Sequence, residues 1–426
     1  MQEAEVPKWN SNEDVRLIDR SLRKMGSVSG GVQHFFDTRH PGERVARSEL
    51  LKALEEHVLS VGEDTHITYL RILSAVEMVK LGSARDALLF MHLYNVCCYF
   101  GAFSAGQVIR SKARAAIIYF YLNASKSYDN KVLNRFAVAA ALETGDLDIV
   151  VGYLNRRDVA LERSPLAKAL RRIGKGGQEP YQPSTEEARY ADSIAGKPLV
   201  IVGPASGAVF VEESTEADSS VVTMNDKSAT IRGFGDQRNY ISYYNGEQLN
   251  GLLTKGMLPP ARLNWVCVKN ASQISQLPSF MDERAETLRG FSRCNLLMLN
   301  GTPNALPNIV YDLAPFSSPR IEITGCDFMM TVLRQPGYVA SGERSHTYEE
   351  MSRIFRRSCA SSHDPISQFL LFKTMLENLP VVPDQRLREV LAMDERVFAA
   401  ELERRYKSAN GGLGSPKRAL SAVPAG

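Results

Sequence analysis

Cysteine is scarce in the sequence, and no two cysteines have the spacing of a metal or redox motif. The 426 residues include six cysteines, of which Cys97 and Cys98 are adjacent and the other four are scattered. This pattern disfavours both a zinc-binding framework and a secreted scaffold held together by disulfides. We therefore expect reduced thiols in a cytoplasmic protein.

Long apolar runs are also missing. The most apolar stretch, residues 87–103, is interrupted by His92 and Asn95 and is slightly short for a membrane span. It predicts a buried helix. The first twenty residues are acidic and polar and lack the apolar segment of a signal peptide. We expect a cytoplasmic location, with peripheral association at the inner face of the membrane as the alternative.

The charges of the chain nearly balance. The formal net charge is +3, and 44% of the residues are hydrophobic and 23% charged, which is typical of a globular protein. So small a positive charge gives no support for binding nucleic acid.

Several catalytic signatures are absent. The dinucleotide-binding pattern G-x-G-x-x-G does not occur at residues 203–208, and the chain has no P-loop, no G-x-S-x-G and no H-E-x-x-H. NAD enzymes, ATPases and hydrolases are therefore disfavoured. The Asp-x-Asp at 146–148 begins a predicted helix, where aspartate caps free N–H groups. We expect no metal and no other cofactor.

What the first half does contain is helical periodicity. From about residue 44 to 173, apolar residues recur every three or four positions and turn signals separate the segments. The pattern predicts a helical domain of stacked hairpins at 44–173, preceded by an extension at 1–43. The predicted helices lie within 47–62, 66–81, 84–102, 107–123, 129–143 and 146–155.

The pattern changes after a segment rich in glycine, proline and glutamine at 174–196, which reads as a linker. Short apolar strands then alternate with helical segments such as 281–291, and this alternation predicts an α/β domain at 197–407 with a mostly parallel sheet flanked by helices. A flexible tail is expected at 408–426. The predicted strands lie within 197–207, 219–226, 263–270, 294–304 and 320–327.

Each predicted strand ends in a small, polar or acidic residue. These residues are Gly203, Asn225, Asn270, Asn300 and Asp327. Because the carboxyl ends of parallel strands meet at one edge of a sheet, and such edges bind ligands, we expect a binding site there. The alternative is that each residue serves only turn or capping chemistry.

The second half, about residues 197–393, resembles the bacterial sialyltransferases that use CMP-sialic acid. The resemblance rests on the order of five pieces: "VIVGPASG", a strand ending "MND", a strand ending in Asn270, "GTPNALPNIVYDLAP" followed by "RIEITGCDF", and "SHDPISQFLLFKTMLENLPVV". The first turn differs from the family pattern, since Gly203-Pro204-Ala205 stands where the family has Gly-Asn-Gly. A Rossmann-like glycosyltransferase fold is what the resemblance implies.

The resemblance also suggests residue roles. His363 precedes a helix that Pro365 can start, and it would be the general base that takes the acceptor's proton. Asp327 would lie beside the donor sugar, and hydroxyls of Tyr338 and Tyr348 would stabilise the departing phosphate. The remaining donor-binding residues would be Gly203, Ser206, Asn225, Asp226, Asn270, Thr302 and Gly325.

Alternatives exist for each of these roles. His363 could merely cap or pack at a helix start, and His346 is a rival base. Thr302 could be only a helix cap. Residues 334–362 read as a lid over the donor, and arginines there could meet phosphate or belong to a charged helix face.

We therefore expect an inverting glycosyltransferase that moves sialic acid, or a related nonulosonic acid, from its CMP derivative to a hydroxyl of a glycan or glycolipid. The CMP-sugar is a substrate, not a cofactor. One alternative keeps the fold and changes the nucleotide-sugar donor. Another is a catalytically degenerate protein in which the helical domain is the working surface and the α/β half is a nucleotide-sugar-binding relic that recruits partners. Neither the acceptor nor the oligomeric state follows from the sequence.

Overall fold

In the computed structural model, the chain forms two compact units. The first contains Met1–Leu133, Tyr348–Ile366 and Glu395–Gly426, and the second contains Asn134–Thr347 and Ser367–Asp394. The structure describes residues 11–40, 48–60, 64–123, 131–155, 164–175, 181–204, 219–224, 239–254, 263–269, 286–316, 318–331 and 347–407.

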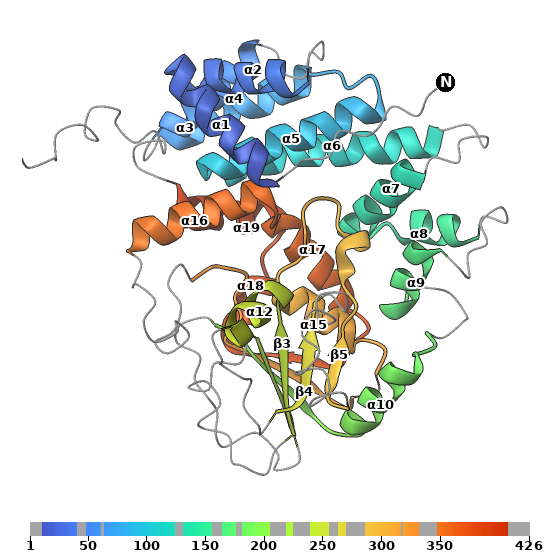
Figure 1. Ribbon diagram of the computed structural model, residues 1–426. Helices are drawn as coiled ribbons and strands as arrows, with labels where there is room; N and C mark the ends of the chain where they lie inside the picture. Colours follow the sequence, from blue (N-terminus) through green and yellow to red (C-terminus); the bar gives the residue numbers. More distant parts are fainter. Residues whose placement is uncertain are drawn as a thin grey trace, which may run out of the picture. The chain divides into compact units, whose positions relative to one another are not determined.

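The described elements of the first unit are helices (Figure 1). They are α1 (Ser11–Met25), α2 (Val28–Arg39), α3 (Ser48–Leu59), α4 (Asp64–Met78), α5 (Ala84–Phe100), α6 (Phe103–Asn123), α16 (Tyr348–Ser361) and α19 (Glu395–Tyr406). Helices α7 (Lys131–Thr144) and α17 (Pro365–Leu376) cross the boundary between the two units.

Helix α5 is the apolar stretch that the sequence predicts as a buried helix, and this prediction is confirmed. Nearly all its side chains are buried, including the polar His92 and Asn95. The Ser83 hydroxyl caps its start by accepting from the Asp86 N–H, and Gly101 ends it in the left-handed conformation at a φ of 78°. Within the described residues, no helix combines the length and apolarity needed to cross a membrane.

The second unit is built on a seven-stranded sheet in which every pair of neighbouring strands is parallel. The α/β class with a mostly parallel, Rossmann-like sheet is thus confirmed. The strand order is β5-β4-β3-β2-β1-β6-β7. The strands are β1 (Leu199–Val202), β2 (Ser220–Met224), β3 (Asn239–Tyr244), β4 (Leu263–Val268), β5 (Leu288–Gly290), β6 (Ile321–Thr324) and β7 (Val381–Pro383).

Helices flank this sheet, and Figure 1 labels several of them beside β3, β4 and β5. The central strands are buried on both faces, since all four residues of β1 and all five of β2 are buried. Such strands appear in a sequence as continuous apolar runs. The remaining helical elements of the described residues are α8 (Leu147–Leu154), α9 (Pro165–Arg172), α10 (Thr185–Ile194), α12 (Gly246–Thr254), the 3-10 helix η2 (Cys294–Leu297), α15 (Ala305–Leu313) and α18 (Gln385–Leu391).

Two sequence predictions in the second unit are wrong, and one strand was missed. The stretch 294–304 does not form a strand, because its apolar residues are buried in η2 and the loop after it. The predicted helix at 281–291 contains β5. Strand β3 was not predicted, because its polar residues hide the apolar pattern. These polar residues find partners inside the protein, as when the Thr223 hydroxyl donates to Ser242.

The segment expected to be a linker also differs. Residues 185–194 form α10, which starts with a reciprocal capping box: the Ser184 hydroxyl accepts from the Glu187 N–H, and the Glu187 carboxylate accepts from the Ser184 N–H. Tyr190 and Ile194 anchor the helix in the core. The polar composition that suggested a linker is that of a capped, half-exposed helix. The compact units likewise have other bounds than the expected domains.

Candidate functional site

The strand order has one reversal, and it lies at β1. From β1 the chain adds β2, β3, β4 and β5 in succession on one side of the sheet, and then β6 and β7 on the other. Strands β1 and β6 are therefore neighbours although more than a hundred residues separate them, with Val202 opposite Thr324. In open parallel sheets, ligands bind outside the carboxyl ends of the strands at such a reversal.

The two residues that follow β1 and β6 are Gly203 and Gly325, both predicted as site residues, and they lie against each other. The Gly203 N–H donates to the Thr324 carbonyl at 2.8 Å. A Cβ atom on Gly203 would lie 2.2 Å from the Cys326 Sγ and 2.3 Å from the Gly325 carbonyl oxygen. Only glycine therefore fits at the end of β1, because the backbone after β6 occupies the space of a side chain.

The turn after β6 has an unusual backbone. Gly325 is left-handed at a φ of 65°, and so are two residues with side chains, Phe328 at 50° and Met329 at 67°. Each such residue costs roughly 1–2 kcal/mol, so it persists only where surrounding contacts impose it, and these conformations cluster at functional sites. Here the Phe328 ring packs against the rings of Phe369 and Phe372, with centroid distances of 6.0 and 5.0 Å.

Asp327 lies inside this turn, and only 4% of it is exposed. Its Oδ2 accepts from the Thr331 hydroxyl and from the Arg386 Nε, the latter at 3.0 Å. Its backbone carbonyl accepts from the Met330 N–H at 3.0 Å. The carboxylate therefore accepts hydrogen bonds from the turn and from an arginine and is shielded from solvent. Arg386 was not singled out from the sequence, because only the contact with Asp327 reveals it.

Asp384 ties the same turn to α18. Its Oδ2 accepts from the Gly325 N–H at 2.8 Å, and its Oδ1 accepts from the Leu387 N–H at 2.8 Å as the cap of α18. Its own N–H donates to the Ile323 carbonyl at 2.9 Å, which continues the parallel pairing of β6 and β7. The end of β6 is therefore held from both sides.

Thr302 and Tyr348 have surroundings that the sequence did not predict. Thr302 follows η2 rather than a strand, so its expected place after a strand ending at Asn300 is wrong. It lies two residues before Asn304, the N-cap residue of α15. The Tyr348 ring is exposed, but its hydroxyl donates to the Arg405 carbonyl at 2.8 Å within the first unit.

His363 is half-buried and belongs to the first unit, whereas Gly203, Gly325 and Asp327 belong to the second. Its N–H donates to the Ser358 carbonyl at 2.9 Å. The neighbouring Asp364 is fully buried and accepts from the Tyr94 hydroxyl at 2.6 Å and from the Ile366 N–H at 2.9 Å. The sequence "SHDP" therefore contains a structural aspartate, and the catalytic role of His363 stays a prediction.

Several predicted site residues lie outside the described residues. They are Ser206, Asn225, Asp226, Asn270, Tyr338 and the rival base His346. Within the described part of the chain, no three His, Cys, Asp or Glu side chains form a group that could hold a metal ion.

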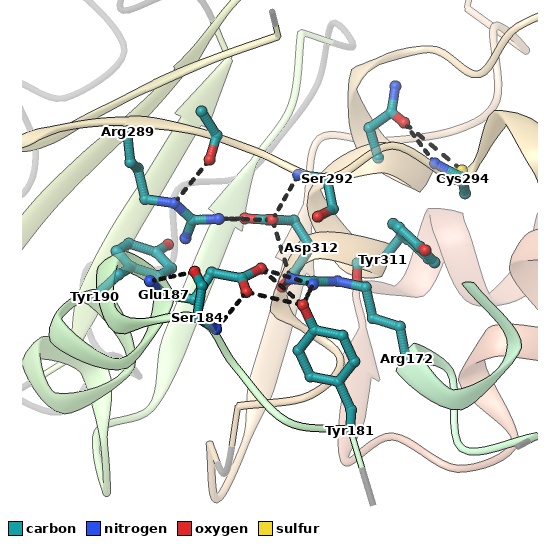
Figure 2. A network of polar contacts seen from close by, with 12 residues as sticks. Arg172, Tyr181, Ser184, Glu187, Tyr190, Arg289, Ser292, Cys294, Tyr311 and Asp312 are labelled. Carbon is teal, nitrogen blue, oxygen red and sulfur yellow. Dashed lines mark hydrogen bonds and ion pairs between the residues drawn. The ribbon is translucent and has the colours of Figure 1, made fainter. Parts of the chain in front are cut away.

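A second cluster of ionisable groups lies in the second unit, around Asp312 (Figure 2). This fully buried carboxylate accepts from the Arg289 Nη2 at 2.7 and 2.8 Å and from the Tyr243 hydroxyl at 2.7 Å. The Arg172 Nη2 donates to it at 3.2 Å. Perturbed ionisable groups often mark active sites, so this cluster is the main rival to the sheet edge.

The charged groups of the cluster are buried, and each lies beside a group of opposite charge. Burial lowers the pKa of Arg289, but the Asp312 carboxylate outweighs this and raises it. Burial would raise the pKa of Glu187, yet the Ser184 N–H and the Arg172 charge lower it to about 2. The ring of Tyr190 lies 4.0 Å from the Arg289 guanidinium. With Arg289 and Asp312 wholly enclosed, we assign the cluster to structure and the sheet edge to function.

Comparison with known proteins adds no relative. No protein-family model, curated protein or solved structure matches the chain.

Proposed function

We propose that the chain binds a nucleotide sugar at the carboxyl ends of β1 and β6 and transfers its sugar. The reaction would be inverting transfer of sialic acid, or a related nonulosonic acid, from the CMP derivative to a glycan hydroxyl. The proposal that a ligand binds here is supported by the strand-order reversal, where Gly203 and Gly325 meet beside a strained turn. The CMP-sugar and the transfer rest on the sequence resemblance.

In this proposal the residues have distinct tasks. Gly203 lets the ends of β1 and β6 approach each other closely, and the ligand would bind outside these strand ends. Asp327 is nearly buried, so it acts through Arg386, whose Nε donates to its carboxylate. His363 is the base that removes the acceptor's proton. Its support is the resemblance alone, because it lies in the other compact unit.

A second candidate function is binding of the nucleotide sugar without transfer. Two observations favour it. Pro204 follows Gly203 and has no N–H to offer a phosphate. The Tyr348 hydroxyl, expected at the departing phosphate, already donates to the Arg405 carbonyl. Binding and turnover therefore have to be measured separately.

The test is calorimetric titration of the full chain with CMP, CDP, UDP, GDP and ADP, followed by a transfer assay with CMP-sialic acid. We expect CMP and CDP to bind most tightly and to raise the melting temperature by mass action. Tightest binding of another nucleotide would favour the alternative donor. CMP binding with no release of CMP from the donor would favour the non-transferring protein. A chain that binds none of the five contradicts the proposal.

A further inference from the structure

Arg386 is the exposed charged group in the contacts that hold the β6 turn. The first residues of α18 follow directly on β7, the strand beside β6, so Arg386 lies at the carboxyl edge of the sheet. Its side chain is 46% exposed, whereas that of Asp327, its partner, is 4% exposed. Solvent at this edge therefore meets the guanidinium rather than the carboxylate.

The hydrogen bonds of Arg386 leave one end of the guanidinium available. The Nε donates to the Asp327 Oδ2 at 3.0 Å. Among the described residues, the two Nη groups contact no hydrogen-bond acceptor. A guanidinium is a planar fork, so a bond at Nε orients the plane while the Nη groups can still bind an oxyanion through two parallel hydrogen bonds. This is the geometry in which arginine recognises phosphate.

The carboxylates of Asp327 and Asp384 already accept hydrogen bonds that hold the turn and the start of α18. Both oxygens of Asp384 accept from backbone N–H groups, those of Gly325 and Leu387. The Oδ2 of Asp327 accepts from Thr331 and Arg386. Their negative charge is therefore compensated by donors of the turn and of the start of α18. An anion that approaches from solvent meets the Arg386 Nη groups first.

We propose that Arg386 binds the phosphate of the nucleotide at this edge, with Asp327 as the positioning residue that orients the guanidinium. The inference rests on the proposed function, because it assigns the phosphate to the same strand ends. It also revises the role of Asp327, which would hold the arginine instead of touching the sugar. Lysine could not replace Arg386, because one ammonium cannot keep the Asp327 contact and still present a planar pair of donors.

The experiment titrates the full chain with CMP, cytidine and inorganic phosphate. Its variants are Arg386→Gln, Arg386→Lys and the matched control Arg388→Gln, an exposed arginine two residues away on the same helix whose partners are Gln385 and the Pro383 carbonyl. We expect Arg386→Gln to weaken CMP binding about 10- to 100-fold, the range for losing charge-assisted hydrogen bonds. Cytidine binding should not change, and Arg388→Gln should bind both ligands like the parent.

The positioning role of Asp327 has its own readout. Asp327→Asn should weaken CMP binding, but should add little in a chain that already carries Arg386→Gln, because both changes remove the same interaction. Independent, additive losses would show that Asp327 contacts the nucleotide itself. If Asp327→Asn does not fold, as its melting temperature would show, the three arginine variants still decide the proposal.

The outcomes separate this inference from the proposed function. If the parent binds CMP and Arg386→Gln binds it equally well, the inference is overturned and the proposed function stands. Equal losses in Arg386→Gln and Arg388→Gln would mean general electrostatic attraction and would also overturn it. If the parent binds no nucleotide but binds inorganic phosphate only while Arg386 is present, the proposed function fails and the phosphate site stands.

Discussion

At the scale of single residues, Gly203 carries a steric requirement that substitution can test. A Cβ atom there would overlap both the Cys326 sulfur and the Gly325 backbone, and the backbone cannot move without disturbing β6. We expect Gly203→Ala to lower the free energy of unfolding by about 1–3 kcal/mol, the usual cost of overpacking a core. Urea denaturation measures this directly.

The control is Gly251→Ala in α12. A Cβ atom at Gly251 would meet nothing within 4 Å. Alanine also favours the helical state over glycine by roughly 0.5–1 kcal/mol. The control should therefore be neutral or slightly more stable. If Gly203→Ala matches it, the close contact between the ends of β1 and β6 is not present in solution.

His40 gives the first unit a predictable response to pH. It is 6% exposed, and its Nε2 lies 3.0 Å from the Nδ1 of His92, so one of these two nitrogens donates and the other accepts. Burial, together with the charges of Arg39 and Arg85, lowers the pKa of His40 to about 4. Its ordinary value is 6.5, and the unfolded chain therefore binds a proton at a higher pH than the folded chain.

The sign follows from this difference. The stability that comes from neutral His40 is fully present above about pH 6.5 and is lost as the pH falls from about 6.5 to about 4. We expect the free energy of unfolding to fall by roughly 1–3 kcal/mol over this range. His40→Gln should lose stability at pH 7 and should have a flatter dependence between pH 6.5 and 4. Parallel curves for the parent and the variant would contradict the assignment.

At the scale of elements, the turn after β6 stores backbone strain. Met329 is 37% exposed at a φ of 67°, a conformation that glycine adopts without strain. We expect Met329→Gly to raise the free energy of unfolding by about 0.5–1 kcal/mol, because relief of strain exceeds the entropic cost of glycine. Met329→Ala is the control, since it removes the same side chain but keeps the strain, and it should not be more stable than the parent.

Strand β3 shows what a buried element needs when its residues are not apolar. Tyr243 donates its hydroxyl to Asp312, and Ser242 accepts from Thr223, so two polar side chains of the strand are satisfied inside the protein. From the sequence alone, "NYISYY" lacks the run of aliphatic residues that marks β1 and β2. The partners that make the strand possible lie in other elements, and no local pattern shows them.

At the scale of the whole molecule, the network around Asp312 joins distant parts of the second unit. It links α9 through Arg172, β5 through Arg289 and α15 through Asp312 itself (Figure 2). Tyr243 joins β3 to the same carboxylate. Asp312→Ala should lower the free energy of unfolding by about 3–5 kcal/mol, because it leaves buried arginine charge without its carboxylate.

Tyr243→Phe is the matched control for this prediction, because it removes the hydroxyl that bonds to Asp312 and Tyr190 but leaves the buried charges in place. It should cost less than Asp312→Ala, about 1.5–3 kcal/mol. Denaturant unfolding of both variants separates the two effects. A loss of less than 1 kcal/mol for Asp312→Ala would show that the charges are not confined as the structure indicates.

The amino-acid sequence by itself determined the class of the fold and most of its local elements. Continuous apolar runs indicate buried parallel strands, so β1, β2, β4 and β6 could be predicted, and so could α4–α8, whose apolar periodicity repeats within one or two turns. Gly203 and Gly325 could be singled out because each comes directly after such a strand, and Asp327 because it follows two residues after Gly325.

Only the tertiary structure decided which of these strand ends meet. The order of parallel strands is set by long connections, and contacts such as Gly203 with Gly325 join residues more than a hundred positions apart, beyond the reach of any local pattern. For the same reason the sequence did not predict the contact between Asp327 and Arg386. Asp327 was expected to face a ligand, but it is buried and holds an exposed arginine. The same reason applies to Asp312, because a charge can be buried only where its partners converge, and these partners come from three other elements.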